Sequence, residues 1–196
     1  MSHQVQTNEN TSLIEPFGVD FDLDLGKMMA PQNHLVRRAS DLRGYYADED
    51  ALENLIAGGD PVMYEVFEIP VPYEFGHLMF CISKLRPGKV GSEYFMTKGH
   101  YHTIVETGET YLGLRGAGYM MLKTQAGDVR AEPIHRGRMV YCPPYWAHRS
   151  VNTSDDDLIS YCVYPADAGH NYGDIEVQGF VKRVVEEDGK AVVKEL

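Results

Sequence analysis

The chain has 196 residues, 43% hydrophobic and 24% charged, which are the proportions of a single soluble globular domain. Its formal net charge is -11 and it has no basic stripe, which excludes a nucleic-acid surface and restricts an anionic ligand to a locally built site. No apolar run is long enough to cross a bilayer and no signal-peptide pattern is present, so we expect a cytoplasmic protein without a membrane partner.

The first part of the chain is polar and then becomes alternating. Residues 1–13 lack periodicity and predict a disordered tail, which leaves residues 14–196 as one domain. Residues 15–26 alternate apolar and acidic side chains, a period of two that predicts a strand. Its apolar face would carry Val19, Phe21, Leu23 and Leu25.

One helix is expected near the N-terminus, in "DEDALENLIAGG". Asp48 is a suitable N-cap, acidic residues fill the first turn, and Gly58 ends the apolar repeat. This composition predicts a helix with a solvated charged face, and we expect one or two short helices in this region.

From Pro61 onward, short segments rich in Val, Tyr, Phe and Ile alternate with Gly, Pro, Asn and Asp. At the end of the chain, Asp188-Gly189 suits the two-residue turn of a hairpin. The pattern predicts an all-β sandwich or barrel. The expected strands are 62–71, 77–85, 93–102, 109–116, 118–124, 137–143, 148–152, 158–165 and the hairpin within 180–196.

The three cysteines, Cys81, Cys142 and Cys162, fit no zinc or CxxC spacing. We interpret them as small core residues in a reducing compartment.

The stretch "TKGHYHTIVETGETY" places His100 and His102 one residue apart, with Glu109 following. In a strand the two imidazoles would point the same way, about 6.5–7 Å apart, and could grip one metal ion. Glu109 begins the next expected strand and would face them if the two strands pair across the turn. An HxH pair alone is weak evidence, because histidine is commonly a surface or core residue.

His148 in "PPYWAHRSVN" is the fourth candidate ligand, on a different hairpin. Three imidazoles and one carboxylate suit a divalent transition metal such as Fe, Mn, Zn or Ni. Four protein ligands in an octahedral shell leave two positions for water or substrate, which is the open arrangement of a catalytic site.

These two segments resemble the paired motifs of the cupin superfamily, whose ligands are an HxH pair, a Glu and a later His. In the second motif Gly137, Pro143, His148 and Asn152 match, whereas Tyr145 stands where cupins usually have Gly. The interval from His102 to Glu109 is also longer than in most cupins.

A narrower group, the cupin-type phosphoglucose isomerases, resembles the chain over about residues 15–190. The shared strings are "EPFG", "DPVMYEV", "PGKVG", "TKGHYH", "PPYWAHR" and "YPADAGHNYG". The resemblance implies a double-stranded β-helix, a homodimer, and a glycolytic and gluconeogenic enzyme that interconverts glucose 6-phosphate and fructose 6-phosphate. It also implies one divalent metal ion per subunit, with Fe²⁺ expected and Mn²⁺, Ni²⁺ or Zn²⁺ as alternatives.

The resemblance assigns roles to individual residues. The metal ligands would be His100, His102, Glu109 and His148. The phosphate contacts would be Ser83, Thr97, Gly99 and Tyr164, with Ser83 standing where the family commonly has Thr. Residues along the sugar would be Tyr111, His170 and Tyr172. Without the resemblance, the tyrosines would be interpreted as core aromatics and the "AGHNYG" segment as a turn.

Two mechanisms are compatible with these residues. In the first, Glu109 carries a proton between C1 and C2 through a cis-enediol, and His170 or Tyr172 relays protons between the two oxygens. In the second, a metal-assisted hydride shift needs no base and Glu109 is only a ligand. The alternative functions are an iron-dependent dioxygenase and a non-catalytic sugar-phosphate sensor, and preference for glucose or mannose 6-phosphate is left open.

Overall fold

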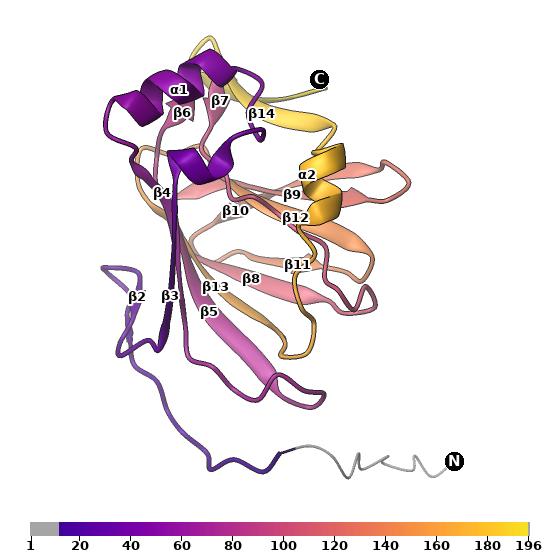
Figure 1. Ribbon diagram of the computed structural model, residues 1–196. Coiled ribbons are helices and arrows are strands. Elements are labelled where there is room, and N and C mark those ends of the chain that lie inside the picture. Colours follow the sequence, from indigo (N-terminus) through magenta and orange to yellow (C-terminus); the bar gives the residue numbers. More distant parts are fainter. Residues whose placement is uncertain (1–11, 196) are drawn as a thin grey trace.

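The computed structural model describes residues 12–195, so nearly all of the tail expected at residues 1–13 lies outside the described residues. Within them the protein is built almost entirely of antiparallel strands (Figure 1), which confirms the predicted all-β class. None of its helices is long and apolar enough to cross a membrane over the described range.

The largest sheet has six strands in the order β11-β8-β13-β5-β4-β3. Strand β13 lies between β8 and β5, far from both in sequence, which is the crossing typical of a jelly roll and confirms the predicted cupin fold. The strands are β3 (Asn33–Arg38), β4 (Val62–Glu68), β5 (Leu78–Leu85), β8 (Glu109–Arg115), β11 (Met139–Cys142) and β13 (Leu158–Pro165).

A second sheet has three strands in the order β10-β9-β12, drawn above β8 and β13 in Figure 1. Side chains from both sheets form the main core, for example Leu122 of β9 and Leu85 of β5. The inner faces of the two sheets therefore enclose the interior. The strands are β9 (Ala117–Thr124), β10 (Val129–His135) and β12 (Trp146–Asn152).

The remaining strands form two small sheets, with orders β15-β14-β7-β6 and β1-β2. The C-terminal hairpin is found as expected, and its turn residues Asp188 and Gly189 have φ of 50° and 72°, as a type I′ turn requires. The strands are β1 (Phe21–Asp22), β2 (Lys27–Met28), β6 (Lys89–Val90), β7 (Glu93–Tyr94), β14 (Lys182–Glu187) and β15 (Lys190–Glu195).

The helices are α1 (Glu49–Ala57), α2 (Gly173–Gln178) and the 3-10 helix η1 (Ala39–Leu42). Helix α1 confirms the expected capping, because the Asp48 side chain accepts a hydrogen bond from the backbone N–H of Ala51 at 2.9 Å. Its apolar face buries Leu52. Helix α2 follows β13 near the C-terminus, where no helix was expected.

The predicted strand over residues 15–26 is wrong in extent. Only Phe21 and Asp22 form a strand, and Leu23 and Leu25 are exposed at 60% and 55%. Phe21 and Met28 pack on the outer face of the large sheet, around Phe67. The alternating pattern therefore predicted burial of Leu23 and Leu25, which do not pack against a sheet.

Strands β3 and β10 were not expected, and both are edge strands. Strand β3 contains two arginines and β10 contains Pro133. Edge strands commonly contain charges and proline, which weakens the apolar pattern by which a strand is detected.

Candidate active site

His100 and His102 lie in the segment that joins β7 to β8, outside any regular strand. His100 forms an isolated bridge with His148 of β12, in which the backbone N–H of each residue donates to the carbonyl oxygen of the other at 3.2 and 3.1 Å. The pairing considered between this segment and the strand beginning at Glu109 is wrong, because β8 pairs with β11 and β13. The segment that carries His100 and His102 is positioned instead by its backbone bridge to β12.

Four side chains converge nevertheless. The ligand atoms of His100, His102, Glu109 and His148 all lie within 4.8 Å of one another. Glu109 Oε2 lies 2.9 Å from His148 Nε2 and 3.2 Å from His102 Nε2. All but His100 are buried, with exposures of 4% or less. The four residues expected to bind metal therefore share one site in the described structure.

Hydrogen bonds fix the orientation of two of the imidazoles. His102 Nδ1 lies 3.1 Å from the carbonyl oxygen of Thr107, and His148 Nδ1 lies 3.4 Å from that of Trp146. A carbonyl oxygen only accepts, so we assign the ring proton to Nδ1 in both residues. With the proton on Nδ1, each Nε2 presents a lone pair toward the Glu109 carboxylate, which a bound cation would stabilise; without an ion, a proton on Nε2 would bridge each ring to Glu109.

The charges of the cluster suit metal binding. Burial raises the pKa of Glu109, but the nearby imidazoles of His148 and His102 outweigh it and hold this pKa well below its usual range. Burial, reinforced by His148, lowers the pKa of His100 well below its ordinary value. Neutral imidazoles and an ionised carboxylate are the protonation states in which these groups bind a metal.

The buried nitrogens provide the test of fit. Nε2 of His100 and Nε2 of His148 are buried and have no hydrogen-bond partner within the described part of the chain. Unpaired buried polar atoms are costly, and a single divalent cation would satisfy both together with His102 and Glu109. The donor set therefore fits a transition metal.

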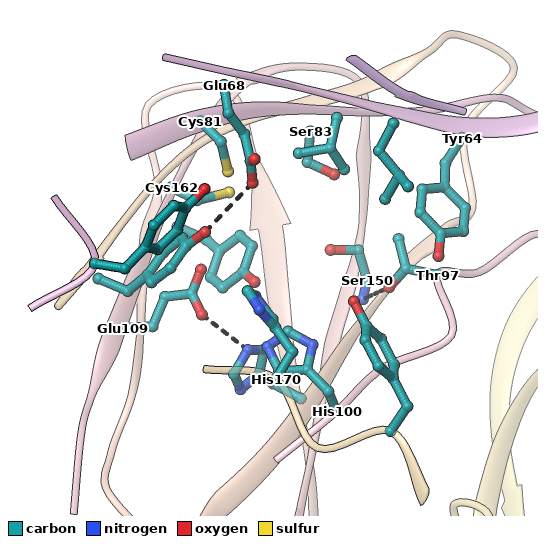
Figure 2. Close-up of a pocket in the computed structure, with 18 residues that line it drawn as sticks. Tyr64, Glu68, Cys81, Ser83, Thr97, His100, Glu109, Ser150, Cys162 and His170 are labelled. Carbon is teal, nitrogen blue, oxygen red and sulfur yellow. Dashed lines mark hydrogen bonds and ion pairs between the residues drawn. The ribbon is translucent and has the colours of Figure 1, made fainter. Parts of the chain in front are cut away.

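A cavity of about 280 Å³ opens beside this cluster, on the inner face of the large sheet. Figure 2 shows its walls, with Thr97, Ser83, Ser150 and Tyr64 on one side and Glu68, Cys81 and Cys162 on the other. Every residue expected at the phosphate or along the sugar lines it: Ser83, Thr97, Gly99, Tyr111, Tyr164, His170 and Tyr172.

The segment with Thr97 and Gly99 is held against β12. The backbone N–H of Ser150 donates to Thr97 Oγ1 at 3.0 Å, and the N–H of Thr97 donates to the carbonyl oxygen of Ser150 at 3.0 Å. Gly99 has φ of 75°, and a Cβ there would lie 2.9 Å from both the carbonyl oxygen of His148 and Cβ of Arg149. Glycine is required here by backbone angle and by space.

The chain is similar to a known enzyme family over most of its length. The model of the family "Glucose-6-phosphate isomerase (GPI)" matches residues 36–196. The chain belongs to this glucose-6-phosphate isomerase family.

The curated relatives are archaeal and bacterial isomerases. Glucose-6-phosphate isomerase of Thermococcus litoralis is 49% identical over 92% of this chain and 95% of its own length. The enzyme of Pyrococcus abyssi is 47% identical over 91% of this chain and 94% of its own. Putative glucose-6-phosphate isomerase 1 of Rhizobium meliloti is 38% identical over 95% and 87%. The similarity thus spans nearly the whole chain.

The pocket of this family member is chemically divided. At one end the Thr97, Ser83 and Ser150 side chains present hydroxyl groups, and Tyr64 lies beside Thr97 (Figure 2). At the other end the Tyr164 hydroxyl donates to Glu68 at 3.4 Å. A carboxylate beside Tyr164 disfavours a phosphate dianion there, which bears on the role expected of this tyrosine.

Four further residues near the site were not expected from the sequence: Tyr64, Glu68, Ser150 and Arg37. The first three line the cavity. Burial raises the pKa of Tyr64 to about 12, although the backbone of Lys98 and the nearby charge of Arg37 of β3 each lower it in part. Tyr64 lies in "DPVMYEV", a string that carried the resemblance, so it could have been found; the others had no local signal.

Some histidines and cysteines of the chain have structural surroundings and no place in the ligand cluster. Among the described histidines outside the site, His34 stacks on Phe67 at 4.4 Å between ring centroids, and its Nε2 lies 2.9 Å from a carboxylate oxygen of Glu65. Cys81, Cys142 and Cys162 are free and buried, as expected of small core residues. The first and last of these also line the cavity.

Proposed function

We propose that the chain is a metal-dependent isomerase that interconverts glucose 6-phosphate and fructose 6-phosphate in glycolysis and gluconeogenesis. One observation carries the proposal: three imidazole nitrogens and one carboxylate converge within 4.8 Å in the wall of a cavity whose far end presents hydroxyl groups. Membership of the isomerase family supplies the substrate.

His100, His102, Glu109 and His148 would hold one divalent ion, for which we propose Fe²⁺, with Mn²⁺, Ni²⁺ or Zn²⁺ as substitutes. When bound, such an ion supplies Lewis-acid polarisation of the sugar oxygens. Thr107 supports His102. The Thr107 hydroxyl oxygen accepts a hydrogen bond from His102 Nδ1 at 2.9 Å, and the Thr107 hydroxyl donates to the carbonyl oxygen of Ile104 at 2.6 Å. This pair keeps His102 Nε2 free for the ion.

The phosphate belongs at the hydroxyl end of the cavity. Thr97 Oγ1 already accepts from the backbone N–H of Ser150, so its own proton is available to a phosphate oxygen. The backbone N–H of Gly99 and the hydroxyl of Ser83 complete the set, with Arg37 adding local positive charge near Tyr64. These local donors would compensate for the repulsion between a phosphate and a protein with a net charge of -11.

The sugar then lies toward Tyr111, Tyr164, His170 and Tyr172. Because Tyr164 donates to Glu68, we place it on the sugar and no longer on the phosphate. Burial raises the pKa of Tyr164 and, chiefly through the same cause, that of Tyr111. Both are therefore neutral hydrogen-bond donors that can orient sugar hydroxyls.

Glu109 is the proposed base. It removes the proton from C2 of the open-chain aldose and returns it to C1, and the reverse reaction uses the same carboxylate. His170 is positioned for relay between the oxygens: its ring lies 4.4 Å from that of His100 and 6.0 Å from that of Tyr172. Isomerisation in D₂O separates this route from a hydride shift, because only the base-mediated route exchanges the transferred hydrogen with solvent.

No observation favours the dioxygenase or the sensor. A dioxygenase has no use for the Thr97 and Ser83 hydroxyl groups, and a sensor has no use for a base. Oxygen consumption by the purified protein would support the dioxygenase, and tight sugar-phosphate binding without turnover would support the sensor.

Three further expectations stay proposals. We propose that residues 14–196 form a single domain, that the enzyme is a homodimer, and that it acts in the cytoplasm. The first is supported by the core that both large sheets share. Size-exclusion chromatography with light scattering tests the second.

A coupled assay tests the main proposal. Purified protein is assayed with fructose 6-phosphate before and after treatment with EDTA, and again after return of Fe²⁺, Mn²⁺, Ni²⁺ or Zn²⁺. We expect chelation to abolish turnover and at least one metal to restore it. An unchanged rate after complete metal removal would refute metal dependence, and absence of turnover with every metal would refute the isomerase.

A further inference from the structure

Cys81 and Cys162 lie directly opposite each other on β5 and β13. The register places them in one cross-strand row on the inner face of the large sheet, between Glu68 of β4 and Tyr111 of β8. Their residue numbers differ widely, so only the fold reveals the pair. All four side chains of this row line the cavity.

The geometry of this pair suits a covalent bond. Directly opposed residues of antiparallel strands have Cα atoms about 4.5 or 5.5 Å apart, and disulfides span about 4.4–6.8 Å. Both thiols lie on the cavity face, and Figure 2 shows the two sulfur atoms close together beside Glu68. Cys142 differs, because its opposite residue is Glu109 of β8.

The two thiols differ in accessibility. Cys81 is 6% exposed and Cys162 is 1% exposed, so a small reagent in the cavity meets Cys81 first. Burial, and then the contact with Cys81, raises the pKa of the Cys162 thiol, so its proton leaves only as the S–S bond forms. The difference in exposure assigns Cys81 as the reacting cysteine and Cys162 as the resolving cysteine.

We propose that Cys81 and Cys162 form a modification site at which a hydroperoxide makes a reversible disulfide that switches off isomerisation. The Cys81 sulfur takes the terminal oxygen of the peroxide and becomes a sulfenic acid, with release of water or alcohol. The Cys162 sulfur then attacks the Cys81 sulfur; the S–S bond forms, the S–O bond breaks, and hydroxide leaves with the Cys162 proton as water. Two thiols are oxidised and one O–O bond is reduced.

The effect on turnover rests on the proposed function. Ser83 lies two residues beyond Cys81 on the same strand face, Tyr164 lies two beyond Cys162, and Tyr111 is opposite Cys162. The bond turns both cysteine side chains within the cavity wall, against Tyr111 and Glu68, and so shifts side chains that position the sugar. Displacement of positioning groups by about 1 Å can cost about 100-fold in rate, so we expect a loss of at least about tenfold.

The experiment uses the holoenzyme loaded with the most active metal other than iron, so that oxidation of the metal does not mimic the effect. It is treated with hydrogen peroxide or with diamide, blocked with N-ethylmaleimide, and divided between a rate assay and peptide mapping by mass spectrometry. Dithiothreitol is then added to a parallel sample. Cys81→Ala, Cys162→Ala and Cys142→Ala are compared, each relative to its own untreated rate.

We expect a peptide joined through Cys81 and Cys162, a parallel fall in rate, and recovery of both with dithiothreitol. Cys81→Ala and Cys162→Ala should be insensitive, whereas Cys142→Ala should respond like the parent. Absence of the joined peptide, a joined peptide without a fall in rate, or a bridge to Cys142 overturns the proposal. If the untreated enzyme converts no substrate, the proposed function fails, and the joined peptide still decides whether the pair is oxidised.

Discussion

Arg149 donates a hydrogen bond to the backbone carbonyl oxygen of Lys98 at 2.6 Å, directly behind the segment that carries Thr97 and Gly99. Its guanidinium lies 4.2 Å from the Phe180 ring centroid. Burial lowers the pKa of Arg149 to about 10, so it remains a cation at neutral pH. Arg149, the residue after the proposed metal ligand His148, thus fixes the proposed phosphate end of the pocket through the backbone of Lys98.

Arg149→Met should therefore impair substrate binding more than chemistry. It removes the donor to Lys98 and leaves that carbonyl oxygen unpaired, so we expect KM for fructose 6-phosphate to rise about tenfold and stability to fall by about 2 kcal/mol. Steady-state kinetics and urea denaturation measure both. Arg138→Met is the matched control, because the Arg138 side chain is 44% exposed in a surface pair with Glu132. An unchanged KM would contradict the role assigned to Arg149.

Thr107→Val should weaken metal binding without touching a ligand. The substitution keeps the shape of the side chain and removes the hydroxyl that accepts from His102 Nδ1 at 2.9 Å. Loss of such supporting contacts typically costs about 10–100-fold in metal affinity. Competition with a chromogenic chelator measures the affinity. Thr110→Val, on the opposite face of β8 from Glu109, is the control; equal affinity in both variants would show that Thr107 does not orient the ring.

Gly99→Ala should lose activity through crowding. A Cβ would lie 2.9 Å from the carbonyl oxygen of His148, and the φ of 75° strains any residue other than glycine by about 1–2 kcal/mol. Gly127→Ala is a close control, because its φ is 97° and nothing lies within 4 Å. Both variants should lose stability, but only Gly99→Ala should raise KM. Similar kinetics in the two variants would show that backbone strain, and not contact with the site, governs the effect.

Residue types and motifs predicted the cluster of His100, His102, Glu109 and His148, but the backbone pairing that brings these residues together was predicted wrongly. The strand-forming composition of the segment predicted a strand from residue 93 to residue 102, whereas β7 ends at Tyr94 and His100 pairs with His148. Pairing between positions so far apart depends on the assembled sheets, and no local pattern encodes it. The same limit hid the opposition of Cys81 and Cys162.

A helix could be predicted where the sequence contains recognisable capping residues. Helix α1 has Asp48 as its N-cap and acidic residues in its first turn. Helix α2 has only six residues, and its N-cap, Tyr172, makes no side-chain capping bond. The helix begins at Gly173, where the expected turn "AGHNYG" ends, and no local signal marks it; its formation depends on packing, for which Ile175 is buried at 1%.

The departure from the cupin motif at Tyr145 has a structural consequence. Tyr145 has φ of 70°, so the backbone keeps the angle that the usual glycine permits. The side chain is 58% exposed. Tyr145→Gly should therefore raise the free energy of unfolding by about 0.5 kcal/mol, the strain relieved less the entropy that glycine adds to the unfolded chain. Urea denaturation measures it, and Tyr73→Gly, 66% exposed without a positive φ, should lose stability. A less stable Tyr145→Gly would show that its ring contributes more than the strain costs.

Glu109→Gln separates the two tasks given to the carboxylate. The amide keeps the size of the side chain but removes its charge and its basicity, 2.9 Å from His148 Nε2. We expect weaker metal binding, and at saturating metal a kcat lower by about 100-fold or more, because the loss of a general base typically costs about 10²–10⁴-fold. Measuring metal content by mass spectrometry alongside kcat distinguishes the effects. If Glu109→Gln binds metal fully and retains near-parental kcat, proton transfer by Glu109 is refuted, and the hydride shift becomes the mechanism to test by deuterium exchange.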